Sequence, residues 1–119
     1  MHNFKELQIW QKAMTLVTKI YSSTAQFDSE HKFGLVSQMQ RAAVSIPSNI
    51  AEGASKNGTK EFIRFLNIAN GSSAELLTQI LICENLNLIT KGDVECLQLE
   101  IEEIQKMNHG LRNTLLKNL

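Results

Sequence analysis

Four basic residues in the first half of the chain have the type and spacing to bind phosphate groups. Lys60 and Arg64 are four residues apart, so they share one face of a helix. Lys56 precedes them in a stretch of loop-forming residues, and Arg41 lies further upstream. Such a cluster suits the phosphates of RNA or DNA, and an oligomer would repeat it around its surface. The alternative is ordinary solubilising charge that nearby glutamates partly neutralise.

Residues for catalysis or metal binding are present, but not in the sets that the chemistry requires. Di-iron bundles need Glu-x-x-His pairs, which the chain lacks, and its cysteines and histidines have no zinc-site spacing. Three serines have no histidine base nearby in the sequence: Ser45, Ser48 and Ser72. Glu52 with Glu61 or Glu75 could form a carboxylate pair, although surface and capping roles are commoner. We therefore expect no enzyme activity, no cofactor or metal, and no small-molecule substrate.

The only proline, Pro47, stands inside a helical pattern that runs from Gly34 to Gly53. Pro47 has no N–H to donate to the carbonyl of Ala43, and its ring clashes with that carbonyl. We therefore expect the helix to bend or break. Ile46 should leave helical angles because it precedes a proline. Three polar residues follow: Ser48, Asn49 and Glu52. They either satisfy the backbone groups that Pro47 frees or form a polar junction with another subunit.

Apolar residues recur at intervals of three and four along four segments, which is the pattern of helices with one buried face. The segments run from about Phe4 to Phe27, Ser29 to Ala54, Thr59 to Asn87, and from Thr90 towards the C-terminus. Asn3 and Thr90 are the expected N-caps of the first and last. Because the loops are short, sequential helices should be antiparallel neighbours. The sequence thus predicts an all-α fold: one domain over residues 1–119, an antiparallel up-down-up-down four-helix bundle with the second helix kinked at Pro47.

Two residues interrupt the apolar faces of the later helices. Gly71 lies at the centre of the third helix, in a run of small residues from Ala69 to Ala74. A glycine within a helix costs about 1 kcal/mol relative to alanine, so we expect compensation by a close crossing with the bent second helix or by approach of a ligand. Asn108 is the one polar member of the fourth helical stripe, where it either fixes the register or oligomer state or faces water.

Charge and hydropathy limit where the protein works. The chain has 12 basic and 12 acidic residues, which gives no whole-molecule positive field for nucleic acid. Residues 1–70 carry eight basic and five acidic residues, and residues 71–119 carry four and seven, so a basic face could meet an acidic face of another subunit. No apolar run reaches membrane-spanning length, and we expect a cytoplasmic protein with no membrane contact. Two thiols are expected to be small buried or half-buried groups, not a disulfide or metal pair: Cys83 and Cys96.

Three blocks of the chain carry a resemblance to a known family: FKELQIWQKAM at Phe4–Met14, FGLVSQMQRAAVSIPSNIAEG at Phe33–Gly53, and EFIRFLNIANGSSAELLTQ at Glu61–Gln79. They resemble the bacterial four-helix bundle proteins encoded in intervening sequences of 23S ribosomal RNA genes. This resemblance implies a homopentamer with no established enzymatic activity. The blocks are also similar to the accessory variability determinant proteins of diversity-generating retroelements, pentamers that bind nucleic acid through basic surfaces.

The matching blocks contain a structural or interface motif made of Ser45, Pro47, Ser48, Asn49, Glu52, Gly53, Gly71 and Ser72. The family often has two arginines where this chain has Gln40-Arg41, and an arginine where Lys56 stands. The sequence and the resemblance together predict a non-enzymatic homo-oligomer that binds RNA or DNA through Arg41, Lys56, Lys60 and Arg64. The alternative is a protein-interaction scaffold with no affinity for nucleic acid.

Overall fold

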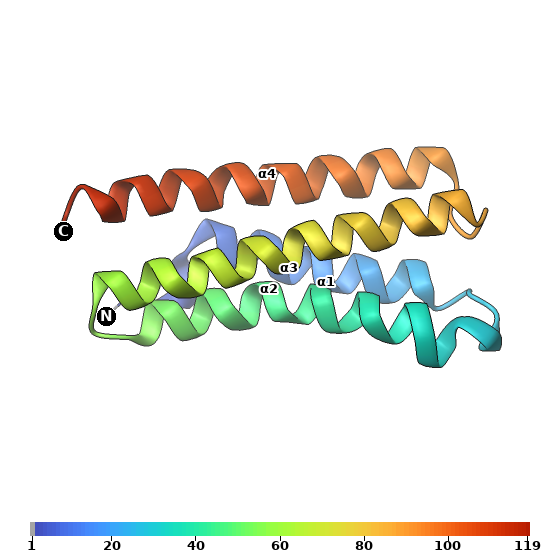
Figure 1. The fold of residues 1–119 in the computed structure, drawn as a ribbon, viewed down its shortest axis with the longest axis horizontal. Helices are drawn as coiled ribbons and strands as arrows, with labels where there is room; N and C mark the ends of the chain where they lie inside the picture. The colour runs from blue at the N-terminus through green and yellow to red at the C-terminus, as the bar shows by residue number, and fades with distance from the viewer. Residues whose placement is uncertain (1) are drawn as a thin grey trace.

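Four long α-helices make up most of the chain in the computed structural model, which describes residues 2–119. They are α1 (Gln8–Thr24), α2 (Ser37–Ser55), α3 (Thr59–Asn85) and α4 (Lys91–Leu116). Figure 1 shows them side by side in a body of 47 × 23 × 20 Å, with the α1–α2 and α3–α4 connections at one end and both termini at the other. Residues 2–119 contain no strand, so the predicted all-α class is confirmed.

The N-terminal helix is shorter than the apolar pattern predicts and is interrupted near its start. A 3₁₀ turn, Phe4–Glu6, precedes α1, and Leu7 between them is extended. Asn3 caps this turn, because its Oδ1 accepts a hydrogen bond from the Lys5 N–H at 3.2 Å. The predicted cap therefore serves the 3₁₀ turn and not α1, whose N-cap is Leu7. The side chain of Gln11 donates to the Lys5 carbonyl at 2.9 Å, which holds the turn against the first residues of α1.

The second helical segment begins at Ser29, as predicted, but it changes type on the way. A 3₁₀ turn (Ser29–His31) and a wider π-helical turn (Lys32–Val36) lead into α2. The expected break at Pro47 is wrong, since α2 is one continuous α-helix and Ile46 keeps its helical conformation. Both residues are buried, and tertiary packing here overrides the local preference of a residue before proline. A bend at Pro47 stays a prediction.

Capping residues define the ends of α3 and α4. Gly58 is the N-cap of α3, and Thr90 is the N-cap of α4, where its hydroxyl oxygen accepts from the Asp93 N–H at 3.2 Å. Helix α3 ends at Asn85, two residues before the predicted end. Asn87 follows with a φ of 60°, a left-handed conformation that asparagine tolerates well and that turns the chain towards α4.

The core is formed by the inward-facing apolar stripes of all four helices, and α2 and α3 pack tightly against each other at Gly53. A Cβ on Gly53 would lie 2.8 Å from the Cβ of Phe65 and 3.0 Å from Cδ1 of Phe62. Only a glycine fits this point of the helix pair. Gly71 differs, because a Cβ there would meet no atom within 4 Å. The close crossing expected at Gly71 is therefore wrong, and the tight contact between the two helices is at Gly53.

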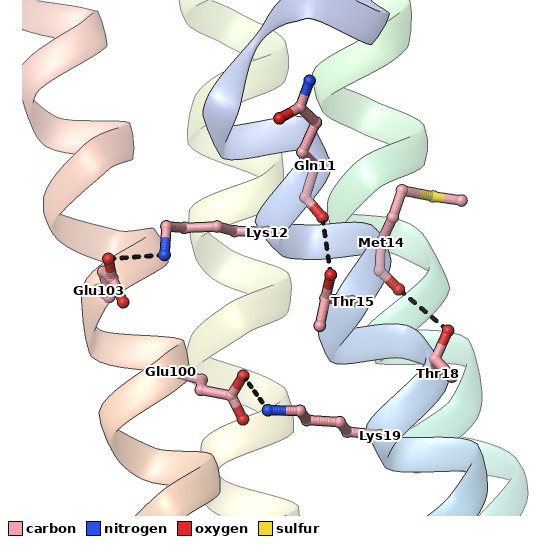
Figure 2. A network of polar contacts seen from close by, with 8 residues as sticks. All are labelled: Gln11, Lys12, Met14, Thr15, Thr18, Lys19, Glu100 and Glu103. Atoms are coloured by element: carbon pink, nitrogen blue, oxygen red, sulfur yellow. Dashed lines mark hydrogen bonds and ion pairs between the residues drawn. The ribbon is translucent and has the colours of Figure 1, made fainter.

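Polar contacts join α4 to its two neighbours. Asn108 is 1% exposed and donates from Nδ2 to the Leu66 carbonyl of α3 at 2.9 Å, so it faces α3 and not water. Towards α1, Lys12 pairs with Glu103 at 2.8 Å and Lys19 with Glu100 at 2.7 Å, as Figure 2 shows. Such exposed pairs contribute at most about 1 kcal/mol each. No helix among residues 2–119 is both long and apolar enough to cross a membrane.

Candidate functional site

Three of the four predicted basic residues gather where α2 turns into α3, and we call them the basic cluster: Lys56, Lys60 and Arg64. The ring of Phe65 is the common platform of two of them. Arg64 places its guanidinium carbon 4.5 Å from the centre of this ring, and Lys56 places its Nζ at 5.7 Å. Lys60 lies in the first turn of α3, one helical turn before Arg64.

Two glutamates compensate part of this charge. Glu52 lies 3.8 Å from Lys56 and Glu61 lies 3.2 Å from Arg64, with all four side chains well exposed. Lys60 is in no ion pair among residues 2–119. The cluster with its two glutamates therefore keeps one net positive charge. Because the pairs are exposed, they are weak and leave the cations accessible to a stronger anion.

Arg41 does not join the basic cluster. It precedes Gly53 by twelve residues on α2, which corresponds to about 18 Å of helix, and Gly53 contacts Phe65 at the cluster. Arg41 instead lines an open groove between α2 and α3 with a volume of about 730 Å³. The other lining residues are Gln38, Ala42, Ser45, Ser72, Glu75, Thr78, Gln79 and Ile82.

A small hydrogen-bond network links the two walls of this groove beside Pro47. The hydroxyl oxygens of Ser45 and Ser72 are 2.8 Å apart, and Asn49 donates from Nδ2 to the Ser45 carbonyl at 2.8 Å and to its Oγ at 2.9 Å. Asn49 thus binds both the backbone carbonyl and the side chain of Ser45. It does not donate to the carbonyl of Ala43, which receives no hydrogen bond from Pro47 because proline has no N–H. Ser48 is exposed. The network fixes α2 and α3 to each other.

The thiols differ in their surroundings. Cys83 is fully buried, with its Sγ 3.4 Å from Sδ of Met39, and burial raises the pKa of this thiol. Cys96 is exposed, which corrects the expectation of a buried or half-buried group. Both are free, as expected. Among residues 2–119, no three His, Cys, Asp or Glu side chains are placed to hold a metal ion.

The fold and the motifs can be compared with known proteins. A family model described as "23S rRNA-intervening sequence protein" matches residues 5–110. The chain belongs to this family. The match covers the residues of the groove network and of the basic cluster. No curated protein matches the chain.

A solved structure shows the same fold as this chain. It is the crystal structure of a protein with unknown function from the S23 ribosomal protein family of Bacteroides thetaiotaomicron, with a TM-score of 0.81 at 22% identity. The alignment covers 88% of this chain and 95% of the other. At this identity the likeness concerns the fold alone.

Two features of the site do not follow from the sequence pattern. Apolar spacing places Phe65 on the inner face of α3, and its second role as the platform under Lys56 and Arg64 depends on the α2–α3 turn. Gln79 is 6% exposed on α3, and its Oε1 is buried with no hydrogen-bond partner in the part of the chain that the structure describes. The sequence does show Gln79 as a polar residue within the apolar stripe of α3, and this position could have indicated a buried amide.

Proposed function

We propose that this chain is a non-enzymatic, self-assembling bundle that binds RNA or other nucleic acid through the basic cluster. The observation that carries the proposal is the convergence of Lys56 and Arg64 on Phe65, with Lys60 one turn away. A guanidinium and two ammonium groups within a short distance can each contact a phosphate. The family resemblance supports the choice of nucleic acid and implies five subunits in the assembly.

Self-assembly is what makes a modest cluster effective. A cluster with one net positive charge binds a polyanion weakly. Identical clusters held on one assembly act together, because the second contact forms at a high effective concentration. The chain would meet its target in the cytoplasm.

The motif beside the groove has an architectural role in this proposal. Gly53 allows α2 to approach α3, and Ser45, Asn49 and Ser72 hold the helices in register. Pro47 lies on the buried side of α2, and Ser48 and Glu52 lie on its exposed side. These residues set the angle at which the α2–α3 turn presents the basic cluster. Arg41 stands apart from the cluster, in the groove between α2 and α3.

Binding to a structured RNA at low ionic strength tests this function, measured by fluorescence anisotropy. The wild-type chain should bind, and the double variant Lys60→Ala/Arg64→Ala should bind at least tenfold more weakly. Lys106→Ala/Lys117→Ala removes the same charge from exposed positions elsewhere and should retain most of the affinity. If the wild-type chain fails to bind, or if both double variants lose affinity equally, the proposal is wrong. A stable oligomer that binds no RNA or DNA would instead favour the protein-interaction scaffold.

A further inference from the structure

The outer face of α3 beside the groove has the features of a surface that is covered by another molecule. Ile68 and Ile82 are 40% and 41% exposed, and both lie on a stripe at intervals of three and four with Gly71 between them. Gly71 costs α3 about 1 kcal/mol relative to alanine. Nothing in the described chain compensates, because the space beside it is empty. A glycine there does permit a bulky group from outside to reach the helix backbone.

Gln79 provides an independent sign of incomplete contacts on this face. It lines the groove one turn from Ile82, and its buried Oε1 has no donor within the described chain. A buried polar atom without a partner costs roughly 1–3 kcal/mol. Because Gln79 lines the groove, rotation of its amide towards a donor on a docked molecule would remove that cost.

The charges on this face indicate what docks there. Arg41 and Glu75 both line the groove, each about one turn from the contact between Ser45 and Ser72. Neither is in an ion pair among residues 2–119. Arg41 has five N–H donors, so it can hold an incoming carboxylate. The complementary ligand is a helix with a bulky apolar residue and a carboxylate one turn away.

The chain itself carries such a helix. On α4, Leu99 is 67% exposed, the most exposed aliphatic residue within the four α-helices. Glu95 precedes it by four residues and Glu102 follows it by three, so one carboxylate lies a turn to either side on the same face. Neither glutamate is in an ion pair in the described chain. We call Glu95, Leu99 and Glu102 the α4 ridge.

We propose that the α4 ridge of one copy docks on the α2–α3 face of the next copy, with Leu99 opposite Gly71. Because the carboxylates flank Leu99 symmetrically, one of them reaches the level of Arg41 whichever way the docked helix runs. Two different surfaces meet in this contact, so it repeats from copy to copy and closes into a ring where the rotation permits. The inference rests on the self-assembly within the proposed function and names the surfaces that produce it.

Two single variants test the contact, each blocking one of its surfaces. Gly71→Leu fills the space that Leu99 would enter, and Leu99→Arg removes the apolar centre of the ridge. Both sites are exposed, and a Cβ at Gly71 meets no atom of its own chain, so both variants should keep the helical content and cooperative unfolding of the wild-type chain. Light scattering should show an oligomer for the wild-type chain and a monomer for each variant.

Mixing the two variants gives the decisive result. Gly71→Leu retains an intact α4 ridge, and Leu99→Arg retains an intact α2–α3 face, so an equimolar mixture should form a complex of two chains and no larger one. The inference is wrong if the wild-type chain stays monomeric, if either variant alone keeps the wild-type mass, or if the mixture stays monomeric. RNA binding is scored separately with Lys60→Ala/Arg64→Ala, which should still assemble, so failure of one proposal does not imply failure of the other.

Discussion

Gly53 of α2 and Phe65 of α3 approach so closely that a Cβ on Gly53 would lie 2.8 Å from the Cβ of Phe65. The carbonyl oxygen of Phe62 would be 3.2 Å away. Neither atom belongs to the flexible end of a side chain, so neither can move without shifting α3. This contact sets the spacing of α2 and α3 next to the basic cluster.

Replacing Gly53 by alanine should therefore destabilise the fold. We expect Gly53→Ala to lower the free energy of unfolding by about 1–3 kcal/mol, the usual cost of an overpacked core. Urea unfolding followed by circular dichroism measures it. Gly71→Ala is the matched control: at concentrations where the chain is monomeric it should raise stability by up to about 1 kcal/mol, since alanine favours the helix and meets no neighbour. A Gly53→Ala chain as stable as the wild-type chain would contradict the assigned packing.

The contrast between the two glycines shows what the sequence can and cannot predict. Apolar periodicity predicted four helices, and the cap at Thr90 was placed correctly because capping depends on nearby residues. Both glycines looked alike as residues within helices. Whether each glycine lies in the contact between α2 and α3 depends on the rotation of its helix in the assembled bundle, and local sequence does not determine that rotation.

The same limit applies to Pro47 and Arg41. A local rule predicted a break at Pro47, but packing around Ile46 keeps α2 continuous. Residue type alone groups Arg41 with the other basic residues, and the length of α2 places it well away from them. Lys60 and Arg64 lie one turn apart on α3, as their local spacing predicts.

Asn108 should contribute to stability through its hydrogen bond to α3. Asn108→Ala removes the bond from Nδ2 to the Leu66 carbonyl and leaves a void at a residue that is 1% exposed. We expect a decrease of about 1–3 kcal/mol in the free energy of unfolding. Asn113→Ala, an exposed change on the same helix, should alter it by less than about 0.5 kcal/mol. Equal effects of the two substitutions would show that Asn108 does not join α4 to α3.

The buried thiol of Cys83 predicts a dependence of stability on alkaline pH. Burial raises the pKa of Cys83 above its ordinary value of 9.0, so the unfolded chain loses this proton at lower pH than the folded chain. The contribution of the protonated Cys83 thiol to the stability of the folded chain is complete below pH 9.0 and declines as the pH rises above it. The free energy of unfolding should be measured on both sides of that pH. It should decline less with rising pH for Cys83→Ala than for the wild-type chain. The stability of Cys96→Ala, a change at an exposed site, should decline as it does in the wild-type chain. Identical curves of stability against pH for all three proteins would show that the Cys83 thiol does not cause the decline.

The most direct test of the central claim is the salt dependence of RNA binding, compared between the wild-type chain and Arg64→Ala. If the basic cluster binds phosphates, the logarithm of the affinity should fall linearly with the logarithm of the salt concentration. The slope should decrease in magnitude by about 0.7–0.9 for each phosphate that the variant no longer neutralises, with Lys106→Ala keeping the wild-type slope. A slope that Arg64→Ala leaves unchanged, or no binding by the wild-type chain at low salt, would contradict the proposal that this cluster binds nucleic acid.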